Sequence, residues 1–262
     1  MLADWIISNF PPHRVYVEPF GGAASVLLQK PRCYAEVYND LDDEMVNLFK
    51  VVRDRGGELR TALELTPFSR TEYRASFELS DDPLEQARRT VVRSYMGFGS
   101  NALCRDIQSG FRSNSNRSGT TPAHDWTNYP MALDGIIARL KGVVIENYPA
   151  EKLFETHDSP DTLFYCDPPY VHATRSLTVM HGNHGYNFEM TDEQHRDLAA
   201  QLHTLAGMVV LSGYDCDLYG ELYGDWNCVM KASLADGASK RTEVLWLNTA
   251  AWDATPQPHL LR

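Results

Sequence analysis

The apolar residues of the chain follow two patterns, and segments rich in polar residues, glycine or proline separate them. Apolar residues at helical spacing predict helices at residues 2–10, 23–30, 42–53, 58–65, 83–95, 132–140 and 192–206. Short runs of apolar and β-branched residues predict strands at residues 15–18, 34–38, 143–146, 163–166, 207–212, 227–230 and 243–248. The opening order of strand, helix and strand is a βαβ unit and predicts a mostly parallel sheet. The last two strands predict an antiparallel hairpin at its edge, so we expect an α/β fold.

The pattern changes between about residues 56 and 131. Helical stretches there are followed by the polar run SGFRSNSNRSGTTPAHDW at residues 109–126, which contains almost no apolar residues. Such a run is typical of an inserted subdomain or a mobile loop. We therefore predict that residues 1–55 and 132–262 form one domain and that residues 56–131 form an insertion.

Composition narrows the class of protein. The chain has 262 residues, of which 43% are hydrophobic and 23% charged, as in ordinary globular proteins. We find neither a run of about 20 apolar residues nor a signal-peptide pattern, which favours a soluble, cytoplasmic protein. The cysteines show no paired CxxC spacing, which disfavours a disulfide framework and a cysteine zinc site. They are Cys33, Cys104, Cys166, Cys216 and Cys228.

The charge is unevenly distributed. The net charge is −11, which by itself disfavours binding to phosphate backbones. Residues 88–117, however, contain six arginines and a single acid, Asp106, so this stretch has a local charge of about +5. The arginines are Arg88, Arg89, Arg93, Arg105, Arg112 and Arg117. Two interpretations remain open: a nucleic-acid-binding surface on an acidic protein, or a solvated helix face.

Candidate chemistry begins at the end of the first predicted strand. Gly21 and Gly22 follow this strand and precede a predicted helix, where the backbone can approach a ligand closely. Glu18 at the strand end would repel a pyrophosphate but suits a cationic group. Asp40 ends the next strand, 19 residues after Gly21, at about the spacing at which an acid reaches ribose hydroxyls. This unit therefore suits an adenosine-bearing ligand without phosphates, as S-adenosylmethionine is.

A second candidate site follows the strand predicted at residues 163–166. The next residues are Asp167, Pro168, Pro169 and Tyr170. The prolines lack the N–H groups that a strand needs, so they must end it. The result is a rigid loop that presents a carboxylate, a carbonyl and an aromatic ring.

Three blocks in this order resemble the Dam-like (D12) class of DNA adenine N6-methyltransferases. They are EPFGGAASVL at 18–27, YNDLDDEMVNLF at 38–49 and FYCDPPY at 164–170, and the resemblance extends from about Trp5 to Asn248, including LSGY at 211–214 and RTEVLWLN at 241–248. It implies a Rossmann-like sheet with an inserted, mainly helical DNA-recognition subdomain, S-adenosylmethionine as cofactor and double-stranded DNA as partner. A cytoplasmic monomer encoded by a bacterium or phage is expected, acting in restriction-modification or another form of DNA methylation.

The resemblance also assigns residues. The cofactor residues would be Glu18, Pro19, Phe20, Gly21, Gly22, Ser25, Asp40, Asn147 and Asp167. The catalytic residues would be Asp167, Pro168, Pro169 and Tyr170. Adenine N6 is a weak nucleophile, so the Asp167 carboxylate and the Pro168 carbonyl would each accept one of its N–H groups. Tyr170 would stack on the base, which must leave the duplex to reach the site.

The arginine-rich region lies between Asp40 and Asp167, where the family places DNA recognition. Candidate DNA-binding residues are Arg88, Arg105, Arg112, Asn114, Asn116, Arg117 and Tyr186. Arginine and asparagine together suit phosphate contacts and base-edge recognition, although a polar loop without contacts has the same composition. Tyr186, with Asn187 and Phe188, would fill the gap left by a flipped base or pack its own loop. His172, His181 and His184 lack acids or cysteines at ligand spacing, so no metal is expected.

Members of this family usually have a Gly-Gly-Lys segment before the first helix, whereas this chain begins within that helix. Truncation, replacement by another element, or weak cofactor binding would each explain this. Alternatives to an active enzyme are therefore a weak or inactive DNA-binding relative, or an amino-methyltransferase acting on cytosine N4 or a glutamine amide. The basic insertion, and aspartate at position 167, favour adenine in DNA over the amide.

Overall fold

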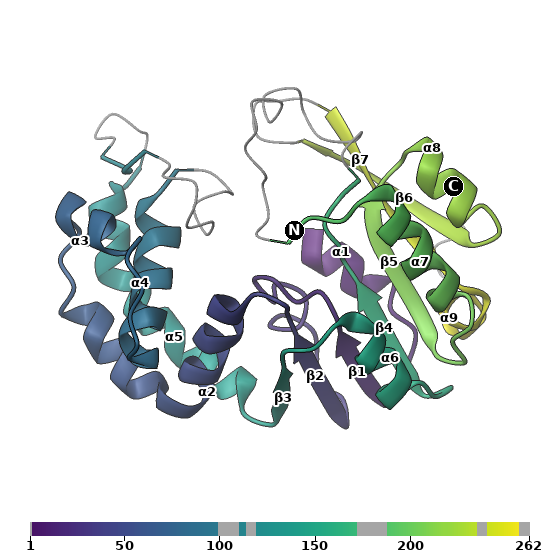
Figure 1. Ribbon diagram of the computed structural model, residues 1–262, viewed down its shortest axis with the longest axis horizontal. Coiled ribbons are helices and arrows are strands. Elements are labelled where there is room, and N and C mark those ends of the chain that lie inside the picture. Colours follow the sequence, from purple (N-terminus) through teal and green to yellow (C-terminus); the bar gives the residue numbers. More distant parts are fainter. Residues whose placement is uncertain (1, 99–109, 114–118, 172–187, 235–239, 257–262) are drawn as a thin grey trace. The chain divides into compact units, whose positions relative to one another are not determined.

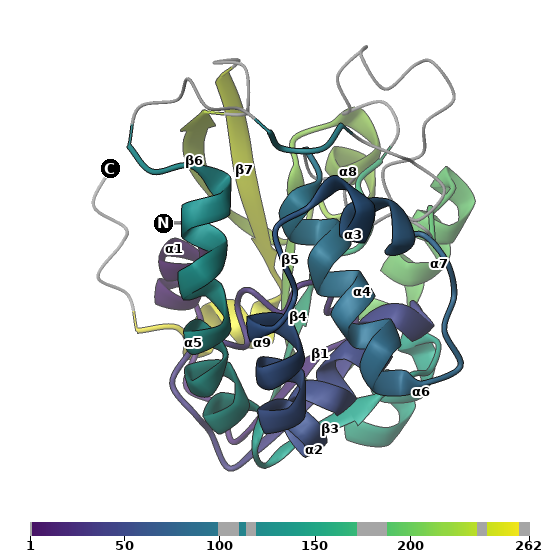
Figure 2. The ribbon, with the colours of Figure 1, turned by 90° about the vertical axis from the view of Figure 1, so that its left-hand side faces the viewer.

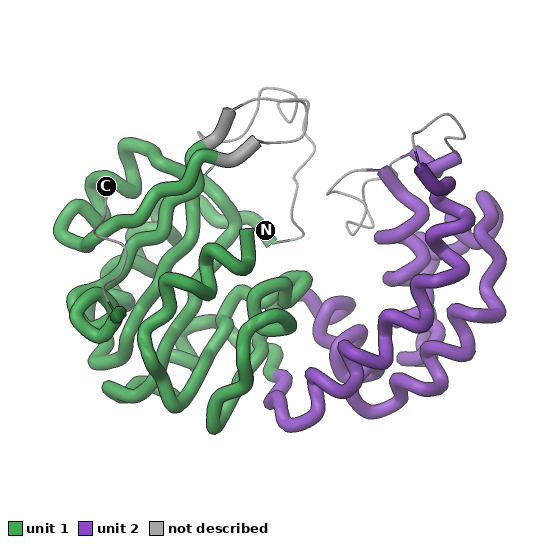
Figure 3. Tube along the Cα trace, turned by 180° about the vertical axis from the view of Figure 1, so that it is seen from behind, with its two compact units in different colours: residues 1–41, 146–180, 188–262 green, residues 42–145, 181–187 purple. Residues whose placement is uncertain are grey.

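The computed structural model describes residues 2–98, 110–113, 119–171, 188–234 and 240–256 (Figure 1). The chain divides into two compact units (Figure 3). The sheet unit contains residues 1–41, 146–180 and 188–262, and the helical unit contains residues 42–145 and 181–187. The predicted boundaries at residues 55 and 131 lie within the helices α2 (Asp43–Glu64) and α5 (Pro122–Leu140), and residue 55 is at a kink in α2.

The sheet has seven strands in the order β3-β2-β1-β4-β5-β7-β6. They are β1 (Val15–Glu18), β2 (Ala35–Asn39), β3 (Val143–Glu146), β4 (Thr162–Cys166), β5 (Met208–Tyr214), β6 (Asn227–Leu234) and β7 (Lys240–Leu247). Strand β1 is parallel to β2 and β4, and β4 is parallel to β5. Strand β7 is antiparallel to β5 and β6. The mostly parallel sheet with an antiparallel edge hairpin is thus confirmed.

One face of the sheet is apolar. Val17, Phe164 and Leu211, from β1, β4 and β5, are fully buried in a single core. Three helices contribute side chains to this core: α6 (Ala150–His157), α7 (Asp192–Leu202) and α8 (Asp217–Leu222). Figure 1 shows these helices beside the strands that they cover. This face supplies most of the apolar burial in the sheet unit.

The opposite face is also buried but has polar groups. Strand register and the alternation of side chains place seven residues on it, which we call the polar face. They are Tyr16, Glu18, Glu36, Tyr38, Tyr165, Ser212 and Glu243, each no more than 7% exposed. Phe10, which follows helix α1 (Leu2–Ser8), packs against Tyr16 and Tyr165. The centre of its ring lies 5.9 and 5.5 Å from the centres of their rings. Such burial of polar groups requires internal partners.

The helical unit is built around α2. It packs against both α4 (Pro83–Met96) and α5 (Pro122–Leu140), and α3 (Arg70–Ala75) packs against α4 (Figure 2). Each helix begins with a side chain that accepts a backbone N–H: Asp42, Ser69, Asp82 and Thr121. The predicted helices 42–53 and 58–65 form the single helix α2, with a kink at Arg55, where φ is −128°.

Other predicted elements also differ from the structure. Residues 23–30 form turns rather than a helix, because Ala24 has a φ of +53° and the N–H of Leu27 donates to the Glu18 carboxylate. Helix α5 starts at Pro122, ten residues before the prediction, after the cap Thr121. The short helices α3, α6, α8 and α9 (Thr249–Ala254) were not predicted. Among the described helices, none combines the length and apolar character needed to cross a membrane.

Candidate active site

The strand order changes direction between β1 and β4, and open α/β sheets bind ligands at the carboxyl ends of such strands. Glu18 is the last residue of β1 and is 2% exposed. Its carboxylate accepts the Tyr16 hydroxyl at 2.7 Å and the Leu27 N–H at 3.2 Å. Burial raises the pKa of Glu18 to about 8, and the charge of Asp167 also raises it, whereas the bond from Tyr16 opposes the rise. A buried acid at this position suits a cationic ligand.

Asp167 follows the last residue of β4. It takes the place at the end of this strand that Glu18 takes at the end of β1. Burial raises the pKa of Asp167 to about 7, and the charge of Glu243 on β7 also raises it. Hydrogen bonds with the Ser212 and Tyr170 hydroxyls act in the opposite direction. Oδ1 of Asp167 is buried and has no hydrogen-bond partner among the residues that the structure describes. Asp167 therefore offers an unfilled acceptor for a donor on a ligand.

The rest of the Asp-Pro-Pro-Tyr loop lies beside β5. Pro168 is buried and Tyr170 is partly exposed. The Tyr170 ring lies 4.6 Å from the ring of Tyr214, the last residue of β5, with the two planes tilted by 53°. Sequence reasoning did not assign Tyr214 or Glu243 to the site. The available signals were a tyrosine after LSG and an acid directly before the apolar run VLWL at residues 244–247.

The Gly-Gly turn is held against the end of β2. A Cβ atom on Gly21 would lie 2.1 Å from Cε2 of Tyr38, and Gly22 has a φ of +47°. The Gly22 N–H donates to the Asp40 carboxylate at 2.7 Å, and the Tyr38 hydroxyl donates to the Gly22 carbonyl at 2.8 Å. The helix predicted at residues 23–30 does not follow this turn, and the N–H groups of Gly22 and Leu27 both have carboxylate partners.

The other predicted cofactor residues surround this turn. Nδ2 of Asn147, after β3, donates to the Asp40 carbonyl at 2.8 Å. Pro19 is buried, Phe20 is partly exposed and Ser25 is exposed. The carboxyl ends of β1, β2, β3 and β4 thus bring together the residues predicted for the cofactor. The arrangement fits S-adenosylmethionine chemically, because the buried Glu18 and the partly buried Asp167 suit a sulfonium and Asp40 suits a ribose.

Metal ligands were also considered. Within the described part of the chain, no three histidine, cysteine, aspartate or glutamate side chains gather as metal ligands would. His172, His181 and His184 lie outside the described residues.

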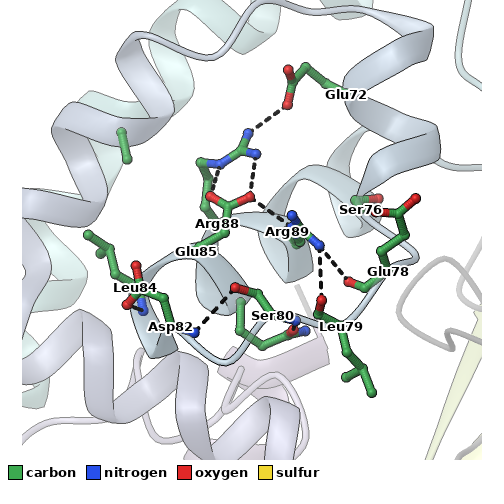
Figure 4. Close-up of polar contacts among 12 residues, drawn as sticks. Glu72, Ser76, Glu78, Leu79, Ser80, Asp82, Leu84, Glu85, Arg88 and Arg89 are labelled. Carbon is green, nitrogen blue, oxygen red and sulfur yellow. Dashed lines mark hydrogen bonds and ion pairs between the residues drawn. The ribbon is translucent and has the colours of Figure 1, made fainter.

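Three of the six arginines, Arg88, Arg89 and Arg93, pair with acids within the helical unit, and Figure 4 shows the pairs of the first two. Arg88 donates to Glu85 at 2.7 and 2.8 Å and to Glu72 at 2.8 Å. Arg89 donates to Glu85 at 2.7 Å. Hydrogen bonding by Arg88 lowers the pKa of Glu85 to about 2. Arg93 is fully buried and paired with Glu44.

These pairs correct the charge interpretation. The local charge of about +5 did not include acids from outside residues 88–117. Arg88, a predicted DNA contact, has Glu72 and Glu85 as partners within the helical unit. Arg112 is partly exposed, donates to the Tyr95 carbonyl at 3.2 Å and has its guanidinium 5.9 Å from the centre of the Tyr95 ring. Five other predicted contacts lie outside the described residues: Arg105, Asn114, Asn116, Arg117 and Tyr186.

The chain is similar in sequence to known proteins. Residues 1–240 match the family model described as D12 class N6 adenine-specific DNA methyltransferase. A protein named DNA adenine methylase from Escherichia coli (strain K12) is 28% identical over 234 residues, covering 85% of this chain and 80% of its own length. The protein of that name from Serratia marcescens is 27% identical over 235 residues, covering 85% and 82%. A solved structure described as a conserved hypothetical protein of Streptococcus pyogenes aligns over 90% of this chain and 87% of its own, with 10% identity and a TM-score of 0.32.

Proposed function

Because this chain belongs to the family of D12 class N6 adenine-specific DNA methyltransferases, we propose that it transfers a methyl group from S-adenosylmethionine to N6 of a flipped-out adenine in double-stranded DNA. The observation that carries the proposal is the buried, unpartnered Oδ1 of Asp167 at the switch point of the sheet. An acceptor without a donor in this position suits the exocyclic amine of adenine.

The acceptor residues act on N6. Its lone pair is delocalised into the ring, so hydrogen bonds that favour a pyramidal nitrogen increase its nucleophilicity. Asp167 accepts one N6–H through Oδ1, the Pro168 carbonyl accepts the other, and Pro169 restricts the loop backbone. Tyr170 stacks on the flipped base. The proton lost from nitrogen after transfer leaves through Asp167 or solvent.

The cofactor residues would bind and orient S-adenosylmethionine. S-adenosylmethionine, when bound, supplies an electrophilic methyl group on a positively charged sulfur. Glu18 would lie near this positive charge, Asp40 would accept hydrogen bonds from the ribose hydroxyls, and Asn147 would border the adenine. Much of the rate then comes from alignment of the two reactants.

The helical unit would recognise DNA. Residues 56–131 were predicted as the recognition insertion, and they belong to the segment 42–145 of the helical unit, which lies between Asp40 and Asp167 in the chain. Arg112 would contact phosphate. Arg105, Arg117, Asn114 and Asn116 would add phosphate and base contacts, and Tyr186 would fill the gap left by the base.

A methyl-transfer assay tests the proposal. Purified protein is incubated with labelled S-adenosylmethionine and unmethylated genomic DNA, and the digested nucleosides are separated. We expect label in N6-methyladenine, loss of label in Asp167→Ala, and retention in the control Glu221→Ala, whose carboxylate is 63% exposed in the same unit.

Cofactor binding is measured for each variant by calorimetry. Label no higher than that of Asp167→Ala, with cofactor binding intact in the unsubstituted protein, would contradict the enzymatic proposal and favour a DNA-binding relative. Label in N4-methylcytosine would assign a different acceptor.

A further inference from the structure

Asn39, the last residue of β2, connects three loops through its side chain. It is fully buried. Its Nδ2 donates to the Pro19 carbonyl at 2.8 Å and to the Tyr148 carbonyl at 2.9 Å. Its Oδ1 accepts the Tyr148 N–H at 2.8 Å. Both amide hydrogens and the amide oxygen therefore have partners.

Each of these loops contains proposed cofactor residues. Pro19 lies between Glu18 and Phe20, Tyr148 follows Asn147, and Asn39 itself precedes Asp40. Backbone bonds reinforce the same arrangement, since the Gly21 N–H donates to the Asn39 carbonyl at 2.8 Å. The carboxyl ends of β1, β2 and β3 are thus joined at one buried amide.

We propose that Asn39 is a positioning residue that sets the spacing of the three cofactor loops without touching the cofactor. This inference rests on the proposed function, because it assumes that these loops hold S-adenosylmethionine. Loss of the amide would allow Glu18, Asp40 and Asn147 to move relative to one another. Cofactor affinity would fall more than DNA affinity.

Only an amide meets the chemical requirements of this position. Aspartate has the same shape but would direct an oxygen at two carbonyl oxygens, which repel it. Alanine would remove the donors to the Pro19 and Tyr148 carbonyls and the acceptor of the Tyr148 N–H. Asn39→Asp is therefore the most informative variant, and Asn39→Ala is the second.

The chain offers a matched control in Asn248. This residue is 8% exposed, and its Oδ1 accepts from Val209 and Ala251 at 3.0 and 2.9 Å. Its Nδ2 donates to the Gly207 carbonyl at 2.9 Å. Gly207 precedes β5, so Asn248 lies at the amino end of the parallel strands, opposite the cofactor loops. Asn248→Asp introduces the same chemical change at the same burial.

The test compares Asn39→Asp, Asn39→Ala and Asn248→Asp with the unsubstituted protein. Calorimetry with S-adenosylmethionine is done well below the lowest Tm of the set, and steady-state kinetics give kcat and both KM values. We expect Asn39 variants to raise Kd and KM for S-adenosylmethionine about tenfold or more, a factor typical of losing one buried hydrogen bond. KM for DNA, and kcat at saturating cofactor, should change less than about twofold.

Asn248→Asp should lower Tm while leaving Kd for S-adenosylmethionine within about twofold. Equal cofactor affinity in Asn39→Asp and the unsubstituted protein would overturn the inference, as would equal weakening by Asn248→Asp. Failure of both Asn39 variants to fold would overturn it in favour of a purely structural role. If the unsubstituted protein does not bind S-adenosylmethionine, the proposed function fails instead.

Discussion

The sheet unit and the helical unit both contain carboxylates with shifted pKa values, but the shifts have opposite directions. In the helical unit, Arg88 and Arg89 hold the Glu85 carboxylate, and hydrogen bonding lowers its pKa to about 2. In the sheet unit, burial raises the pKa of Glu18 to about 8 and that of Asp167 to about 7. The difference arises because arginines donate hydrogen bonds to Glu85, whereas burial disfavours the charged forms of Glu18 and Asp167.

The direction of a pKa shift indicates whether ionisation of the carboxylate stabilises or destabilises the fold. A carboxylate with a lowered pKa stabilises the fold above its unfolded-state pKa, and that contribution is lost as pH falls through the folded value. An acid with a raised pKa acts in the opposite sense: its ionisation destabilises the fold as pH rises toward the folded value. Such groups persist where ligands or reactions use them. We therefore assign stability to the arginine pairs and reactivity to the polar face.

The largest expected effect is that of Asp167→Asn on activity. We expect kcat to fall on the order of 10³-fold, because loss of one charged acceptor at a reacting group costs about this much. Thermal stability should stay equal or rise at pH 8, since asparagine removes the ionisation that disfavours the fold. Steady-state kinetics and calorimetric melting measure the two quantities. A fall in Tm at pH 8 together with full activity would contradict this assignment and show that Asp167 contributes to stability rather than to the reaction.

The second effect concerns the buried pair of Arg93 and Glu44. Arg93→Met leaves a buried carboxylate without its cation, so the free energy of unfolding should fall by about 3 kcal/mol or more. Urea titration measures the change. Adding Glu44→Met should restore much of the loss, because two apolar side chains replace two buried charges. If the double variant is no more stable than Arg93→Met, the uncompensated charge of Glu44 is not the cause of the lost stability.

The third effect is a shift in the pH profile. Asp167 must be ionised to accept N6–H, so kcat/KM should fall about tenfold per pH unit below about 7. Because Glu18 and Asp167 interact, the profile reports values of the pair. Glu243→Gln removes a like charge and should move this acid limb to lower pH, which raises relative activity at pH 6 roughly two- to tenfold. Glu221→Gln, at an exposed position, should leave the profile unchanged.

The smallest effect distinguishes two arginines of the helical unit. Arg88→Met should lower the free energy of unfolding by about 1.5 kcal/mol, as expected for lost charged hydrogen bonds, with DNA affinity within about twofold. Arg112→Ala should weaken DNA binding and reduce the salt dependence by about one phosphate contact. Fluorescence anisotropy with labelled duplex at several salt concentrations measures both. If Arg88→Met reduces the salt dependence of DNA binding instead, Arg88 contacts a DNA phosphate.

Local patterns in the sequence were sufficient for the strands. The runs at residues 15–18 and 143–146 match β1 and β3 residue for residue. An apolar run that ends in two prolines leaves few alternatives, so the carboxylate of Asp167 could be placed at a strand end. Short helices such as α3 and α8 have six residues each, too few for a clear helical period.

The remaining errors involve partners distant in sequence. The helix predicted at residues 23–30 ignored Glu18, whose buried carboxylate takes the Leu27 N–H. The arginine count ignored Glu72, which is 16 residues from Arg88, and Glu44, which is 49 residues from Arg93. Glu243 is 76 residues beyond Asp167 in the sequence. Its charge raises the pKa of Asp167 because folding brings their strands into one sheet.

The sequence by itself therefore determined the strands, their polarity pattern and the order of the Gly-Gly, Asp40 and Asp-Pro-Pro-Tyr segments, because these depend on residues adjacent along the chain. Only the tertiary structure decided which charges are compensated. Arg88 and Arg93 face acids in the helical unit, while Glu18 and Asp167 meet at neighbouring strand ends. Electrostatic energy depends on distance in space and on burial, and folding sets both.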